Sequence, residues 1–161
     1  MRNRWLIGAL LLPACHGGGA APGAVKPQGA APVTAEAAVR AFIQAATDSN
    51  IARMAMLWGT DKGSAYETHQ PSDYMHRLEV IQLYLRNINY TVGKIHPADN
   101  DAGKTVVDVI IDRKACSRTM PVTTVQSSKD GWIVNQLDLN TAGNPSRPCR
   151  DAGGDAVAPK Q

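Results

Sequence analysis

The sequence predicts an α+β domain in which three amino-terminal helices pack on an antiparallel sheet of about four strands. Between residues 34 and 88, apolar side chains recur at spacings of three and four, which is the period of an amphipathic helix. Between residues 90 and 139 they alternate with polar side chains, which is the period of a strand with one buried face. Helices followed by a run of strands are typical of α+β folds rather than of alternating parallel ones.

The first fourteen residues, MRNRWLIGALLLPA, have the pattern of a secretory signal. Two arginines precede an apolar run that is too short to span a bilayer. The tetrapeptide Leu12-Pro13-Ala14-Cys15 resembles the bacterial lipobox. This resemblance implies that residues 1–14 are removed and that Cys15 carries several acyl chains, which together give stable membrane anchoring. The alternative is an ordinary signal peptide cut near Ala14, which would leave Cys15 as a thiol.

A lipidated Cys15 predicts a location in the bacterial cell envelope, on a lipid anchor that faces the periplasm. His16 takes the second mature position, where an aspartate retains some bacterial lipoproteins at the inner membrane. By analogy, the outer membrane is therefore favoured over the inner one. Residues 15–33 are interpreted as the lipidated cysteine and a flexible tether, because glycine, alanine and proline dominate them.

Three helices are predicted in the domain, which extends over residues 34–139. Thr34 is placed to cap the first helix and Ser72 the third. The run Asp48, Ser49 and Asn50 is expected to end the first helix and to cap the second. Each helix has one apolar face: Val39, Phe42, Ile43 and Ala46 in the first, Ile51, Met54, Leu57 and Trp58 in the second, and Tyr74, Leu78, Ile81, Leu85 and Ile88 in the third. Gly59 is expected to end the second helix, because glycine commonly follows a helix.

Four strands are predicted after the helices. Their inward positions are Tyr90 and Val92 in the first, Val107, Val109 and Ile111 in the second, Met120, Val122 and Thr124 in the third, and Ile133, Leu137 and Leu139 in the fourth. The run Lys129-Asp130-Gly131-Trp132 predicts a hairpin turn, since glycine adopts a positive φ without strain. Residues 140–161 are rich in glycine, alanine and proline and predict a loose carboxyl-terminal segment.

The predicted order of elements resembles that of the nuclear transport factor 2-like superfamily, to which ketosteroid isomerases belong. In this order, helices are followed by a meander that contains Asp130-Gly131-Trp132-Ile133-Val134. The resemblance covers residues 33–139, and within it the chain is similar to small bacterial lipoproteins of that fold. It implies a curved, cone-shaped sheet that encloses a pocket with the helices. Some members use this pocket as an active site, and others use it to bind ligands or subunits. A homodimer formed through the sheet would fit this resemblance.

Cys116 and Cys149 are predicted to form a disulfide. Lipidation of Cys15 leaves an even number of cysteines, and the compartment outside the cytoplasm is oxidising. The bridge would pin the segment after Leu139 to the turn before the third strand. Two free thiols are the alternative.

The balance of charged residues and the spacing of the histidines argue against several classes of partner. Removal of the leader leaves 15 basic and 14 acidic residues, without the concentrated positive patch that nucleic-acid binding requires. His69 and His76 lie seven positions apart and do not match the i, i+4 histidine pair of a helical zinc site. We expect no nucleic acid, metal or cofactor.

The acidic residues are poorly placed for catalysis. An isomerase of this fold needs a buried carboxylate with a donor such as tyrosine opposite it, whereas Asp108 and Asp112 alternate with core positions and are expected to face solvent. No catalytic residue is therefore assigned. Asn135 is expected either to point inward, where it would need a partner, or to mark the mouth of a filled cone. Candidate pocket-lining residues are Trp58, Tyr66, Tyr74, Tyr84, Tyr90, Trp132 and Asn135.

Two functions of different classes remain open. The favoured one is a membrane-anchored, non-catalytic module that binds a small apolar ligand or an envelope protein. The alternative is a small-molecule isomerase or dehydratase of the ketosteroid isomerase type, which an inward carboxylate within hydrogen-bond reach of a tyrosine would indicate.

Overall fold

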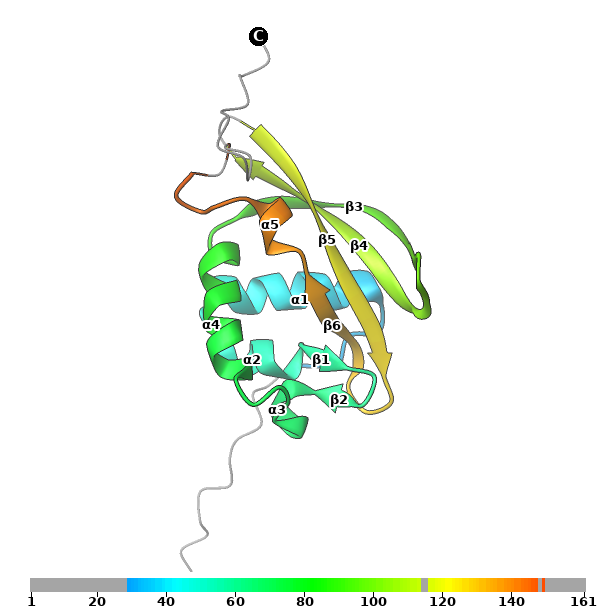
Figure 1. The fold of residues 1–161 in the computed structure, drawn as a ribbon. Coiled ribbons are helices and arrows are strands. Elements are labelled where there is room, and N and C mark those ends of the chain that lie inside the picture. Colours follow the sequence, from blue (N-terminus) through cyan, green and yellow to red (C-terminus); the bar gives the residue numbers. More distant parts are fainter. Residues whose placement is uncertain (1–28, 114–115, 148, 150–161) are drawn as a thin grey trace, which may run out of the picture.

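The computed structural model describes residues 29–113, 116–147 and 149. Within this part of the chain, helices and a small ribbon precede a four-stranded antiparallel sheet, so the α+β prediction is confirmed (Figure 1). The helices are α1 (Ala35–Thr47), α2 (Ile51–Met56), α3 (Ala65–Thr68), α4 (Tyr74–Leu85) and α5 (Leu139–Ala142). The ribbon pairs β1 (Gly59–Thr60) with β2 (Gly63–Ser64), and the sheet contains β3 (Asn89–Ala98), β4 (Asp101–Arg113), β5 (Cys116–Ser127) and β6 (Gly131–Leu137).

The expected set of three amino-terminal helices is only partly right. Four described helices precede the sheet and a fifth follows it. The short helix α3 was not predicted, because a single turn is too short to display an apolar period.

The sheet is curved, with its strands in the order β3-β4-β5-β6 and each strand paired with its neighbour in sequence (Figure 1). Val107, Val109 and Ile111 of β4 alternate toward the core and are fully buried. Helix α1 packs against the sheet, and α4 packs on α1 and α2. Phe42 of α1 and Leu78 of α4 belong to the same buried cluster as these strand residues.

Two of the three predicted helix caps are correct. Thr34 Oγ1 accepts a hydrogen bond from the Ala37 amide at 3.1 Å, and Asn50 Oδ1 accepts one from the Arg53 amide at 2.9 Å. Ser72 is not a cap, because α4 begins one position later than predicted, with Asp73 as the capping position.

The position of Gly59 after an apolar helical face predicted that it ends the second helix, but this prediction is wrong. Helix α2 ends at Met56, with Leu57 as its capping residue. Gly59 instead lies in the β1–β2 ribbon, where a Cβ atom would clash with the carbonyl oxygen of Gly63. Close approach of two backbones therefore explains this glycine.

The predicted hairpin turn joins β5 to β6, and Gly131 has a φ of 71°. Asp130 in this turn also contacts the ribbon, because its Oδ2 accepts a hydrogen bond from the Ser64 amide at 2.9 Å. The predicted fourth strand is too long. It ends at Leu137, and Leu139 begins α5, because Asp138 Oδ1 accepts a hydrogen bond from the Asn140 amide at 3.1 Å.

Contacts with the domain begin before residue 34. The Pro32 carbonyl accepts a hydrogen bond from the Trp132 amide at 3.0 Å. The Arg53 guanidinium donates to the carbonyls of Gly29 and Ala30 at 3.2 and 3.0 Å. Residues 29–32, which the sequence assigns to the tether, thus lie along the outer side of β6 and beside α2.

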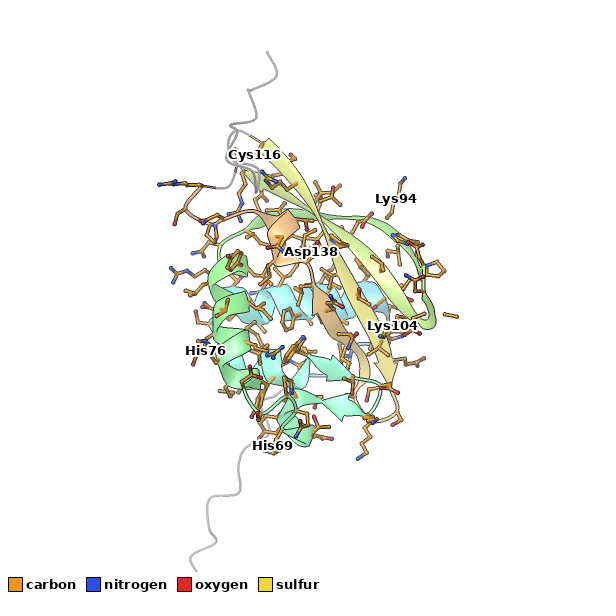
Figure 2. All side chains as sticks on the ribbon, viewed as in Figure 1. His69, His76, Lys94, Lys104, Cys116 and Asp138 are labelled. Atoms are coloured by element: carbon orange, nitrogen blue, oxygen red, sulfur yellow. A yellow bond between two sulfur atoms is a disulfide. The ribbon has the colours of Figure 1, made fainter. Side chains whose placement is uncertain are left out.

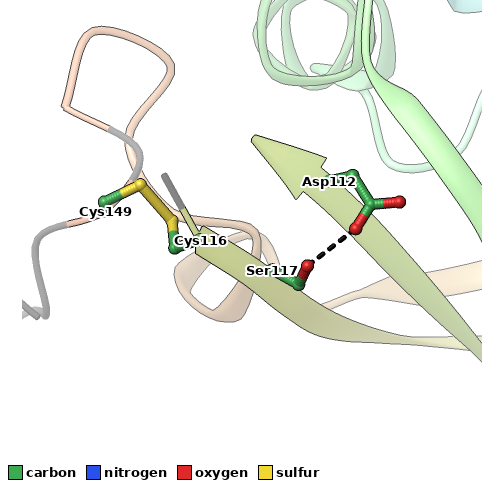
Figure 3. Close-up of a disulfide and its surroundings, with 4 residues drawn as sticks. All are labelled: Asp112, Cys116, Ser117 and Cys149. Carbon is green, nitrogen blue, oxygen red and sulfur yellow. Dashed lines mark hydrogen bonds between the residues drawn. A yellow bond between two sulfur atoms is a disulfide. The ribbon is translucent and has the colours of Figure 1, made fainter. Parts of the chain in front are cut away.

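Cys116 and Cys149 form a disulfide whose Cα atoms lie 5.7 Å apart (Figure 3). The bridge connects the start of β5 to the segment after α5. Beside it, Ser117 Oγ donates a hydrogen bond to Asp112 Oδ1 at 2.7 Å, which links the ends of β4 and β5 (Figure 3).

Candidate functional site

A groove of about 530 Å³ lies between α4 and β6. Its volume falls within the range of about 300–1,000 Å³ that is typical of small-molecule sites. Helix α4 contributes one wall and β6 the other. The lining residues are Trp58, His76, Arg77, Val80, Ile81, Asn135, Gln136, Leu137 and Leu139.

The interior of the groove is mainly apolar. Ile81 is 7% exposed and belongs to the buried core, on the inner side of α4. Leu137 is opposite the buried Val122 in the β5–β6 register and packs against the same core. Val80 lies one position from Ile81 and is 37% exposed, so it continues the apolar wall toward the surface.

Trp58 is held in this groove by the pairing of its own segment with β6. The Val134 amide donates to the Leu57 carbonyl at 2.8 Å, and Asn135 Nδ2 donates to the Gly59 carbonyl at 2.8 Å. Asn135 therefore has the partner that an inward polar residue requires. The indole nitrogen of Trp58 is enclosed and has no hydrogen-bond partner among the described residues.

One cationic side chain, Arg77, lies at the helical wall beside His76, and the lining contains no carboxylate. Arg77 Nε donates to both carboxylate oxygens of Asp73 at 3.0 Å, and this hydrogen bond is the main cause that lowers the pKa of Asp73. His76 Nδ1 lies 3.7 Å from Glu79 Oε2. Figure 2 shows His76 on α4, away from Lys94 and Lys104 on the β3–β4 hairpin.

The seven residues predicted to line a pocket are divided between two environments. Trp58 and Asn135 line the groove. The other aromatic residues do not line it: Tyr66, Tyr74, Tyr90 and Trp132 are partly buried and pack against the core cluster, and Tyr84 is half-buried. Their aromatic rings therefore contribute to packing around the core.

His76, Arg77 and Val80 were not predicted to line a site. The sequence carried no distinctive signal for them, because Met75 and Leu83 are exposed apolar residues of the same helix, as Val80 is. Leu139 was also missed, because the period of two assigned it to a strand rather than to α5.

Within residues 29–113, 116–147 and 149, no cluster of three or more histidine, cysteine, aspartate or glutamate residues could hold a metal ion. Every carboxylate in these ranges is exposed or half-buried. Asp108 and Asp112 are half-buried on the face of β4 opposite to Val109. The buried carboxylate that an isomerase of this kind requires is thus not found in the described part of the chain.

No family model matches the chain, and no curated protein or solved structure matches it either. Among the described helices, none is both long and apolar enough to cross a membrane. The candidate site is therefore defined by the geometry of the groove alone.

Proposed function

We propose that this protein is a lipid-anchored module of the bacterial cell envelope that binds a small apolar ligand, without catalysis, in the groove between α4 and β6. The apolar wall formed by Trp58, Ile81 and Leu137 is the observation that supports this function most directly. Removal of 100 Å² of apolar surface from water contributes about 2.5 kcal/mol. A ligand that covers this wall can therefore offset the entropy lost on association.

The same proposal assigns residues 33–139 to the nuclear transport factor 2-like superfamily. Helices that precede a curved four-stranded meander support it. The Asp130-Gly131-Trp132-Ile133-Val134 motif begins in the β5–β6 turn and continues into β6, as the resemblance expects. A pocket between helices and sheet is the region in which members of that superfamily bind ligands.

Membrane attachment through Cys15 rests on the lipobox, which lies outside the described residues. Replacement of the lipobox cysteine, Cys15→Ser, should release the protein into the periplasm and into the aqueous phase of a detergent extraction. The unsubstituted protein should partition into the detergent phase. Recovery of the unsubstituted protein from the aqueous phase would contradict the lipid anchor. The proposed ligand site would then belong to a protein without a membrane anchor.

Native mass spectrometry tests the groove directly. The Cys15→Ser chain would be secreted by its natural host, so that it meets the molecules of its own periplasm, and would be examined at gentle activation for retained small molecules. We expect a bound apolar species. Val80→Glu should remove it, because a carboxylate would then lie on the apolar wall. Leu83→Glu is the matched control, since Leu83 is an exposed residue of the same helix but does not line the groove.

The outcomes separate the alternatives. Retention that is lost in Val80→Glu and kept in Leu83→Glu supports a small ligand in the groove. An apo mass would contradict it. Capture of an envelope protein that Leu83→Glu abolishes would instead indicate a protein partner on the outer side of α4. The described residues offer no observation that favours the isomerase alternative.

A further inference from the structure

We propose that the ligand of this groove is an amphipathic monocarboxylate, whose apolar chain lies on Trp58 and Leu137 and whose carboxylate binds Arg77. This inference rests on the proposed function and specifies its ligand class. It follows from the side chains that line the groove, because these include the Arg77 guanidinium group and no carboxylate.

Arg77 is a donor held in place at the mouth of the groove. Its Nε atom is occupied by Asp73, at 3.0 Å from each carboxylate oxygen. This contact orients the guanidinium group, but it leaves the two Nη nitrogens without a partner among the described residues. The Arg77 side chain is 55% exposed, so a ligand that enters from solvent can reach these nitrogens. A guanidinium group matches the geometry of a carboxylate.

The other polar groups of the groove leave the carboxylate to Arg77. Asn135 Nδ2 donates to the Gly59 carbonyl, and the Trp58 N–H is enclosed and does not face a ligand. An ionised carboxylate is an acceptor only, so it pairs with the donors of Arg77 while its chain covers the apolar wall.

Charge alone does not select the ligand, since Asp73 compensates the charge of Arg77. The position of Arg77 beside the apolar wall supplies the selectivity. Asp73 is bonded through Nε, and the groove residues Val80 and Ile81 follow Arg77 on the same helix by about one turn. A carboxylate bound by Arg77 therefore lies within one helical turn of the apolar wall that its chain would cover.

Calorimetric titration with decanoate and with decanol tests this assignment. The two probes share one chain length and differ in the charged head group. With the Cys15→Ser chain at neutral pH, we expect both probes to bind and decanoate to bind more tightly. Arg77→Gln should weaken decanoate binding by at least about tenfold, the size expected for a hydrogen bond to a charged group, and should leave decanol binding unchanged.

Arg40→Gln is the matched control, because Arg40 pairs with Glu36 at the same i, i+4 spacing and is similarly exposed, on α1 and outside the groove. It should change neither affinity. Equal affinity for decanol and decanoate, or equal weakening of both by Arg77→Gln, would overturn the carboxylate inference and leave the apolar site standing. Failure of both probes to bind would contradict the proposed function as well.

Discussion

Loss of the Cys116–Cys149 bridge should lower the free energy of unfolding by about 3.7 kcal/mol. The two cysteines are 33 positions apart, and loop-closure entropy gives this magnitude for a cross-link of that length. The closed loop includes β6 and α5 as well as most of β5. Small domains are usually stable by only 5–15 kcal/mol, so this loss would be a large fraction of the total.

The assay is urea denaturation of the Cys15→Ser chain, followed by tryptophan fluorescence, with and without Cys116→Ser and Cys149→Ser. Reductant should destabilise the parent by a similar amount and should leave the double-serine variant unchanged. A loss below about 1 kcal/mol would refute the loop-entropy reasoning. Two reactive thiols in the denatured, unreduced parent would refute the bridge itself.

Other contacts give three further predictions. Asp130→Ala should lower the free energy of unfolding by about 1–3 kcal/mol, measured by urea denaturation, because the buried Ser64 amide loses its acceptor. Asp130→Asn keeps a side-chain oxygen and should lower it by less. Equal losses in the two variants would contradict this explanation. Asp73 should titrate by NMR below the usual pKa of about 3.9, since Arg77 hydrogen bonds to its charged form. Its stabilising contribution is thus present above the unfolded-state pKa and lost as pH falls through the folded-state pKa; an unchanged Asp73 midpoint in Arg77→Gln would refute this cause. His69 has a φ of 53°, so His69→Gly should remove about 1 kcal/mol of backbone strain and raise the melting temperature, whereas a lower melting temperature would show that the side chain contributes more than the strain.

The sequence correctly predicted those elements whose ends and buried faces are determined by neighbouring residues. Helix α1 is an example, because Thr34 caps it and Phe42 lies on its buried face, as the three-four spacing indicates. The β5–β6 turn is another, since Gly131 adopts the positive φ that the Lys129-Asp130-Gly131-Trp132 run indicates. These features depend on residues a few positions apart, which a periodicity detects.

Predictions failed where a distant contact determines the local structure. Gly59 resembles a helix end, but the backbone of Gly63 approaches it in a ribbon that the apolar pattern does not reveal. Leu139 fits the period of a strand, but it begins the short helix α5, which packs on β5. At both positions, the local sequence has two interpretations, and tertiary packing decides between them.

The candidate site was predictable only in part for the same reason. Trp58 and Asn135 stood out, one as a large aromatic residue and the other as a polar residue between apolar strand positions. Arg77 and Val80 are on α4, far from β6 in sequence, and only the packing of helix against strand brings them to one groove. Sequence spacing within one element cannot predict such a juxtaposition.

The most direct test of the central claim is the NMR signal of the Trp58 indole N–H during titration of the Cys15→Ser chain with decanol. Trp58 lines the groove, and Trp132 serves as an internal control because it packs against the core elsewhere. We expect the Trp58 signal to move saturably while the Trp132 signal stays in place. A Trp58 signal that does not move, or equal shifts of both signals, would contradict a ligand site between α4 and β6.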